Sequence, residues 1–219
     1  MKEMETARLQ SSRTIAPTGD ADVRKRLFLS AEKLVAEHGF ELVTSREITS
    51  LANANIAAIN YYYGSKLALL LDIFRTRAAE LNRERKMLLK QALDRNEPCI
   101  GDILHALIEP AILWSDPERL TALRYLNRAR GEGPPEMQAI IQNDVGHLSR
   151  FVDAIQRVCP SLGREETVWK LHFSLGVLHH NSAADYIRLK NLSGDTCDPD
   201  DRSKLLQRTL AFISAGFLS

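Results

Sequence analysis

Residues 44–62 contain two very short helical segments separated by a tight turn. Thr44 or Ser45 can cap the first segment, and the apolar residues that follow, Ile48, Leu51 and Ala52, share one side of barely two helical turns. A helix this short is stable only when it packs against neighbours. The segment therefore predicts a small and closely packed helical unit.

The turn between the two segments reads Asn53-Ala54-Asn55. A three- to four-residue turn between two short helices is the helix-turn-helix spacing, and such a turn usually needs one residue with positive φ. Asn53 is suited to that position because asparagine adopts the left-handed conformation more easily than other non-glycine residues. Asn55 is then a good N-cap for a third helix that runs to about Tyr62.

The rest of the chain shows helical periodicity and no apolar segment of period two. A first helix should begin at Asp20 or Asp22 and end near Gly39, because glycine suits the left-handed residue past a helix end. Ser65 should cap a long amphipathic helix that runs to about Asp94. The fold class is therefore all-α, with further helices expected near residues 99–114, 117–130, 135–158, 164–190 and 200–216.

Composition and cysteine usage indicate a cytoplasmic protein. The chain has 219 residues, of which 44% are hydrophobic and 26% are charged, as in ordinary globular proteins. Cys99, Cys159 and Cys197 lie far apart and in no CxxC or Cys/His spacing, so neither a disulfide framework nor a zinc site is indicated. No apolar run approaches the roughly 18 to 20 residues that cross a bilayer, and we expect no membrane partner.

The charge is distributed unevenly along the chain. Residues 1–95 carry 16 Lys and Arg against 12 Asp and Glu, a net charge of +4, whereas residues 96–219 carry 13 against 16, a net charge of −3. Any polyanion should therefore meet the N-terminal part of the chain. This asymmetry is small, and alone it does not identify a function.

The segment from about residue 24 to 74, and above all its run ITSLANANIAAINYYYGSKLALL, resembles the DNA-binding domain of the TetR/AcrR family of bacterial repressors. Four residues depart from the usual pattern of that family: Asn53 replaces a turn glycine, Ala54 replaces a valine, and Tyr62-Tyr63 replaces His-Phe. Tyr62 and Tyr63 keep aromatic side chains at the last two positions and add a hydroxyl to each. The resemblance covers about a quarter of the chain.

The resemblance implies a dimeric, ligand-responsive repressor that binds a palindromic operator, and no cofactor. It divides the chain into a flexible N-terminal arm (1–19), a helix-turn-helix DNA-binding domain (20–66) and a helical ligand-binding and dimerisation domain (67–219). The polar arm lacks periodicity, and its basic residues leave open whether it touches DNA. The family typically pairs its last two long helices across a four-helix dimer interface, and the apolar residues between 169 and 218 fit that role.

A recognition helix needs small residues where it approaches the floor of the major groove, and Ala57 and Ala58 meet that need. Asn55 and Asn60 are candidates for hydrogen bonds to base edges. The remaining candidates are polar groups suited to phosphates, and they lie at the ends of the short helices: Thr44, Ser45, Arg46, Tyr61, Tyr62 and Lys66.

Simpler interpretations of these residues stay open. Three consecutive residues of a helix fan out by roughly 100° each, so Tyr61, Tyr62 and Tyr63 cannot all face one core. They could form a half-buried aromatic hinge without a ligand. Arg46 could be a solvated surface charge, and Asn60 could hydrogen-bond only within its own turn.

The effector implied by the resemblance should be a small, mostly apolar molecule with one or two polar anchors. Candidate lining residues of its cavity are His105, Ile108, Trp114, Leu123, Tyr125, His172, Leu175 and His179. His179, His180 and Asp185 lack the i, i+4 spacing of ligands to one ion on a helix, so no metal is expected. No nucleophile or phosphate-loop motif indicates an enzyme. The alternative function is a small-molecule-binding or interaction protein of the same fold whose head no longer reads DNA.

Overall fold

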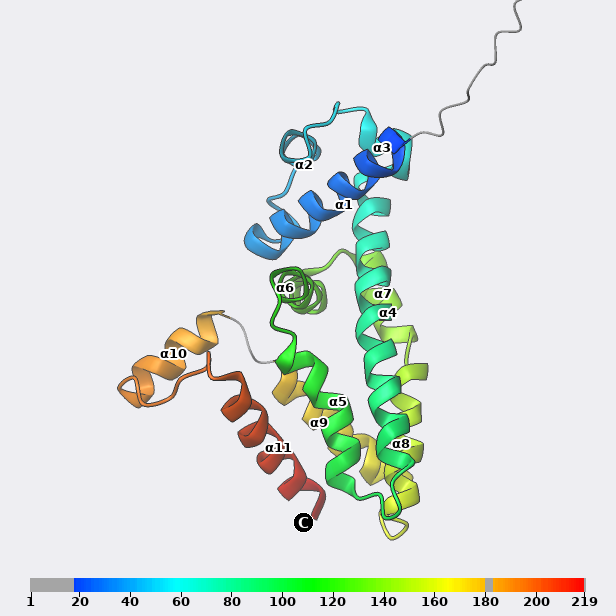
Figure 1. Cartoon of the computed structure of the whole chain (residues 1–219), viewed down its shortest axis with the longest axis vertical. Coiled ribbons are helices and arrows are strands. Elements are labelled where there is room, and N and C mark those ends of the chain that lie inside the picture. Colours follow the sequence, from blue (N-terminus) through cyan, green and yellow to red (C-terminus); the bar gives the residue numbers. More distant parts are fainter. Residues whose placement is uncertain (1–17, 180–182, 219) are drawn as a thin grey trace, which may run out of the picture.

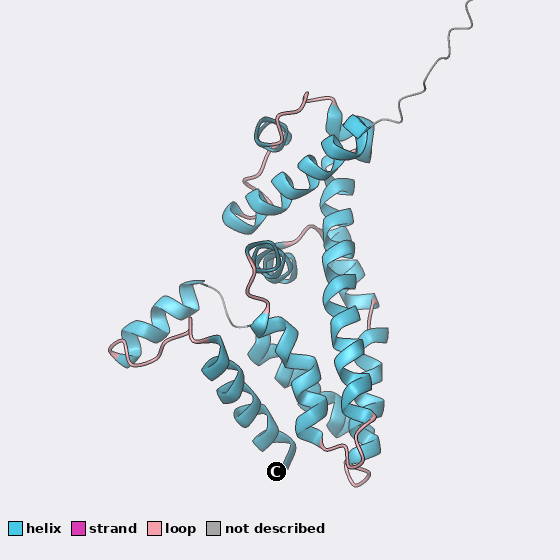
Figure 2. Ribbon diagram, in the orientation of Figure 1, coloured by secondary structure: helices cyan, strands magenta, loops and turns pink. Residues whose placement is uncertain are grey.

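The computed structural model describes residues 18–179 and 183–218. The predicted arm (1–19) lies almost wholly outside these residues, as does His180. Within the described residues all regular structure is helical, in eleven helices and without a strand, which confirms the all-α prediction (Figure 2). The first three helices form a compact unit at one end of a long helix (Figure 1).

The first two helices begin and end as local sequence signals require. Helix α1 (Thr18–His38) starts slightly before the expected Asp20 or Asp22 and stops at Gly39, whose φ of 91° is left-handed. Thr44 caps α2 (Ser45–Leu51), because its side chain accepts a hydrogen bond from the Glu47 N–H. The Glu47 carboxylate in turn accepts the Thr44 N–H at 2.8 Å, which completes a capping box.

The turn after α2 confirms one expectation and corrects another. Asn53 has a φ of 48°, as a residue in the position of a turn glycine should. Asn55 was expected to cap the next helix, but α3 (Ala58–Tyr63) begins later and has Ala57 at its N-cap position. The Asn55 side chain instead accepts the Ala57 N–H at 2.9 Å, so it closes a short turn ahead of the helix.

Helix α4 (Lys66–Leu93) is the longest element and joins the head to the rest of the chain (Figure 1). Its N-cap is Ser65, as predicted, whose hydroxyl accepts the Ala68 N–H at 3.0 Å. The predicted domain boundary after residue 66 therefore falls inside the first turn of one continuous helix. The later helices close to their expected ranges are α5 (Ile100–Leu113), α6 (Pro117–Glu132) and α11 (Arg202–Leu218).

Two long helices expected from the sequence are each divided in the structure. The range 135–158 holds α7 (Pro135–Asn143) and α8 (Gly146–Val158), because Asp144 leaves the helical conformation with a ψ of 73°. The range 164–190 holds α9 (Arg164–His179) and α10 (Ala183–Ser193). Ile141, Val145 and Leu148 keep helical spacing across the first division, which is why the pattern alone suggested a single helix there.

Two apolar clusters make up the core. The first unites the head with α6, since Leu27, Ile48 and Ile59 belong to the same cluster as Tyr125 and Leu126. The second cluster lies among α5, α8, α9 and α11. Helices α5, α6 and α8 pack along the rest of α4, while α11 packs on α5 and α9, and α10 projects to the side (Figure 1). The head is therefore packed directly against the larger helical part, and α6 lies under α1 (Figure 1).

Candidate nucleic-acid interface and ligand pocket

The outer side of the turn and of α3 is a solvent-facing surface of amide, small apolar and aromatic side chains. Asn55, Ala57, Asn60 and Tyr61 are exposed, whereas Ile59 is buried and anchors the short helix on the head core. All of the exposed members except Asn60 line a shallow concavity, which they share with Val23, Asn53, Ala54, Ala58 and Tyr62. The predicted reading residues therefore lie together on one accessible face.

The three consecutive tyrosines point to three different environments. Tyr61 is 75% exposed, and Tyr62 stacks edge-on against it while donating a hydrogen bond to the Asp20 carboxylate. That hydrogen bond, followed by burial, raises the pKa of Tyr62 to about 12. Tyr63 donates to the Arg24 carbonyl at 2.9 Å, under the Arg24 guanidinium. Only the Tyr61 hydroxyl is left facing solvent.

The polar groups near the start of α2 differ in how available they are. Lys66 donates to the Val43 carbonyl, so its ammonium ties the start of α4 to the loop before α2. The Thr44 hydroxyl is engaged in the capping box, and Ser45 is half-buried. Arg46 is exposed and makes no ion pair with any residue that the structure describes. Arg46 is therefore the most available cation on this side of the head.

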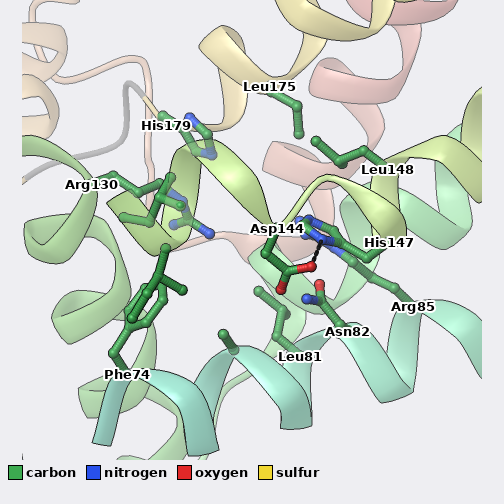
Figure 3. Close-up of a pocket in the computed structure, with 13 residues that line it drawn as sticks. Phe74, Leu81, Asn82, Arg85, Arg130, Asp144, His147, Leu148, Leu175 and His179 are labelled. Carbon is green, nitrogen blue, oxygen red and sulfur yellow. Dashed lines mark ion pairs between the residues drawn. The ribbon is translucent and has the colours of Figure 1, made fainter. Parts of the chain in front are cut away.

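A pocket of about 190 Å³ lies in the larger helical part, between α4, α6, α7, α8 and α9 (Figure 3). Most of its wall is apolar and comes from every one of these helices except α6: Phe74, Ala78, Leu81, Ile140, Ile141, Leu148 and Leu175. The other lining residues are polar or charged: Asn82, Arg85, Arg130, Asp144, His147 and His179. The pocket thus combines an apolar wall with a concentration of basic groups.

The basic groups of the pocket are largely withdrawn from water. Arg85 is 4% exposed and donates from Nε to the Leu107 carbonyl at 2.9 Å; burial lowers its pKa to about 9. Burial also lowers the pKa of Arg130 to about 10. The Nδ1 atom of His147 is buried without a hydrogen-bond partner and lies 4.0 Å from the Asp144 carboxylate.

The same surroundings lower the pKa of both histidines of the pocket. Burial, and then the positive charge of Arg85, lower the pKa of His147. His179 lies at the solvent-facing rim, yet burial of part of its ring and the charges of Arg130 and Arg85 lower its pKa to about 4. The pocket therefore disfavours any additional positive charge.

Comparison with known families covers both parts of the chain. A profile described as "Bacterial regulatory proteins, tetR family" matches residues 27–73, which hold the helix-turn-helix. A second profile, "Tetracyclin repressor-like, C-terminal domain", matches residues 105–216, about half of the chain. The chain belongs to the TetR family of transcription regulators. Comparison with curated proteins gives no match.

Solved structures of TetR-family proteins share the fold of the whole chain. A TetR family transcription regulator from Marinobacter aquaeolei VT8 is 18% identical, with a TM-score of 0.60 over 92% of this chain and 98% of that one. NalD, the secondary repressor of the MexAB-OprM multidrug efflux pump in Pseudomonas aeruginosa, is 17% identical, with a TM-score of 0.57 over 90% and 96% of the two chains. A TetR-like transcriptional regulator from Rhodococcus sp. RHA1 is 17% identical, with a TM-score of 0.54 over 88% and 96%.

Eight residues were expected from the sequence to line a ligand cavity. Two of them, Leu175 and His179, line the pocket. Trp114 is packed in the core and donates from its indole nitrogen to Glu84 at 2.8 Å. Tyr125 is also fully buried and donates to the Leu70 carbonyl at 2.7 Å.

The other four expected residues lie away from the pocket for similar reasons. Ile108 is buried in the second apolar cluster, and Leu123 is partly buried against the first. His105 is exposed beside Glu109, with 3.1 Å between Nδ1 and the carboxylate, and His172 is exposed on α9. Periodicity marks the buried side of a helix but does not show whether that side meets packed atoms or a cavity.

Sequence reasoning missed Arg85 and Arg130, the two cations of the pocket in this TetR-family regulator. A signal for Arg85 was present, because it stands between Leu81 and Leu89 in an i, i+4 row of buried positions that also holds Ile73 and Arg77. An arginine on the buried stripe of a helix must meet either a counter-charge or a cavity. Arg130 gave a weaker signal, since it lies near the end of α6.

No group of three or more His, Cys, Asp or Glu is placed to hold a metal ion among the residues that the structure describes. No helix within the described ranges 18–179 and 183–218 is long and apolar enough to span a membrane.

Proposed function

We propose that this TetR-family regulator is a dimeric repressor that binds a palindromic operator through its two heads and responds to a small effector in its pocket. The observation that carries this proposal is the exposed face of α3, where small and amide side chains surround an outward-pointing tyrosine. Ala57 lets the backbone approach bases, while Asn55 and Asn60 can reach their edges. Arg46 and Tyr61 are positioned to contact phosphates on either side.

An unpaired apolar surface on α9 and α11 supports the dimer. Trp169 and Phe173 stack with ring centroids 5.7 Å apart and are 51% and 62% exposed. Phe212 and Leu218 on α11 are 70% and 76% exposed. Large aromatic side chains on adjoining helices are costly to leave in water, and burying them against a second copy removes that cost. Leu178, Ile213 and Phe217, expected at the same surface, are buried within the chain instead.

Helix α6 offers a direct route from the pocket to the head. Arg130 lines the pocket, while Arg128 on the same helix donates to the Ala36 and Glu37 carbonyls of α1, both at 3.1 Å. A ligand that prefers one position of α6 would favour the corresponding position of the head. The two heads of a dimer would then change their separation and lose their match to two half-sites.

The test measures DNA binding by fluorescence anisotropy over a range of salt concentrations. One probe is a random-sequence duplex, and the other is an operator selected from a random pool for binding to the protein. We expect affinity for random duplex to fall steeply with salt, and the operator to bind more tightly. Arg46→Ala should weaken binding to every sequence and reduce the salt slope by about one. Arg83→Met removes an exposed arginine of α4 outside the head and should change neither the affinity for DNA nor the salt slope.

The alternative, a small-molecule-binding protein whose head no longer reads DNA, is favoured by one observation. The hydroxyl of Tyr62 and the ammonium of Lys66 are both engaged within the head. A folded dimer without affinity for duplex at low salt would establish this alternative and overturn the repressor. Affinity that is insensitive to Arg46→Ala and Tyr61→Phe would contradict the proposed DNA face.

A further inference from the structure

We propose that the occupant of the pocket is a small organic anion: a carboxylate held by Arg85 and Arg130, on a compact apolar body that packs against Phe74, Leu81 and Leu175. This inference deepens the proposed function, since it assigns a chemical class to the effector. It does not depend on whether the heads read DNA. Its evidence is the unmatched charge of the pocket (Figure 3).

Arg77 and Arg85 are both buried on α4, but of the two Arg77 alone has carboxylate partners among the described residues. Arg77 is 5% exposed and is surrounded by carboxylates, with hydrogen bonds of 2.6 to 2.9 Å to Glu32, Glu80 and Glu118. Arg85, two turns later on the same helix, is 4% exposed and makes no ion pair with any described residue. A buried charge is costly unless it is paired. The chain therefore neutralises one of its buried α4 arginines internally and leaves the other for a group from outside.

A second cation and an unsatisfied atom converge on the same space. Arg130 is hydrogen-bonded to the neutral Asn127 side chain at 3.1 Å and, like Arg85, has no carboxylate partner in the described ranges. The buried Nδ1 of His147 has no hydrogen-bond partner among the residues that the structure describes. Such an atom usually marks a place where an unseen group belongs. Arginine is suited to a carboxylate because its guanidinium offers donors in a planar fork.

Asp144 is the one carboxylate that lines the pocket, and among the described residues it pairs with neither arginine. Its side chain is 66% exposed, and its only ion pair in the described part of the chain is the 4.0 Å contact with His147. Two guanidinium charges thus face one solvated carboxylate at the rim. The remaining imbalance is a single positive charge, which a monoanion would offset.

The rest of the pocket determines what the anion is attached to. Seven of its thirteen lining residues are apolar, and they come from α4, α7, α8 and α9. The volume of about 190 Å³ is below the roughly 300–1,000 Å³ of pockets that hold drug-sized ligands. The apolar body should therefore be short or a single ring. A free inorganic anion would leave most of the apolar wall of the pocket without a contact.

The test compares acids with their neutral amides on the full chain without DNA, by calorimetry and thermal unfolding. The probes are octanoate with octanamide, and benzoate with benzamide; inorganic phosphate serves as an anion without an apolar body. We expect at least one acid to bind and to raise the melting temperature. Its amide should bind at least about tenfold more weakly, the effect of losing one charge-assisted hydrogen bond.

Variants locate the site. Arg85→Met and Arg130→Met should each reduce the affinity for the acid by at least about tenfold. Arg83→Met and Arg124→Met remove exposed arginines from the same two helices and should leave it unchanged. Arg85→Met should also keep or raise the melting temperature without ligand, because it replaces an unpaired buried charge by an apolar side chain. If Arg85→Met does not fold, Arg85→Lys and Arg130→Met still test the contact.

Several outcomes would overturn the inference. Equal affinity for acid and amide, equal losses in the control variants, binding of phosphate alone, or no binding by any acid would each contradict it. These results are separable from those for the repressor. If the protein binds the acid but no duplex, the anion site is supported and the repressor function is refuted. If it binds DNA but no acid, the repressor function is supported and the anion site is refuted.

Discussion

The guanidinium of Arg77 on α4 forms a bidentate ion pair with the carboxylate of Glu32 on α1, with N···O distances of 2.6 and 2.8 Å. Both side chains are almost completely buried. Glu80 and Glu118 complete the surroundings of the same guanidinium. Burial raises the pKa of Glu32, and Arg77 opposes that shift. The pair joins the first helix of the head to the helix that carries the pocket.

Arg77→Met should destabilise the protein by about 3–5 kcal/mol, because it leaves the Glu32 carboxylate buried without its partner. Chemical denaturation measures this loss. Arg75→Met, which removes an exposed arginine from the same helix, should change stability by less than about 0.5 kcal/mol. The double variant Glu32→Leu with Arg77→Met should recover much of the loss. Equal stability of Arg77→Met and Arg75→Met would show that the pair has no structural role.

The turn of the head depends on the left-handed conformation of Asn53. Asn53→Ala should cost about 1–2 kcal/mol in the free energy of unfolding, because a Cβ without a hydrogen-bonding side chain is strained at a φ of 48°. Asn53→Gly should cost little, since glycine adopts positive φ freely. Urea denaturation compares the two. A larger loss for glycine than for alanine would mean that the asparagine side chain, and not the backbone conformation, is what the turn requires.

The neutral state of His179 makes stability depend on pH. Its pKa is lowered from 6.5 to about 4 in the folded protein, so between these values the unfolded chain binds more protons. The stabilising contribution is present above pH 6.5 and is lost as the pH falls toward 4. His179→Gln should therefore lose less stability than the wild type between pH 7 and pH 5. His38→Gln, at the exposed end of α1, is the control; an unchanged pH profile for His179→Gln would contradict the shift.

Reading and anchoring residues should differ in their effects on DNA. Asn60→Ala and Ala58→Leu should change which operator sequences bind best, because both positions lie on the face that approaches bases. Tyr61→Phe should weaken binding by a similar factor on all sequences, since a phosphate contact carries no sequence information. Competition binding with a set of single-base operator variants measures both. A uniform loss in all three variants would contradict this division of roles.

The head could be predicted from the sequence in more detail than the pocket. Thr44, Ser65, Gly39 and Asn53 act through contacts or backbone angles within a few residues, so the local sequence was sufficient to assign them. Asn55 was assigned to the wrong local structure because an N-cap and a short side-chain turn both use the same amide.

The pocket depends on how distant helices pack, which no local pattern contains. Arg85 on α4 and Arg130 on α6 line the same cavity, and neither helix alone indicates that the cavity is there. The same is true of Tyr62 and Lys66, whose polar atoms find partners on α1 and in the loop before α2. Trp114 and Tyr125 had the residue types expected of a binding site, but their polar atoms hold core helices together.

Whether the α3 faces of a dimer read an operator can be measured by selecting bound sequences from a random pool of duplex DNA. We expect enrichment of an inverted repeat whose half-site centres lie about 10–10.5 base pairs apart, or a multiple of that. Arg46→Ala should enrich the same repeat less strongly. If a folded wild-type dimer enriches no sequence at low salt, or enriches one without two-fold symmetry, the α3 faces do not read an operator.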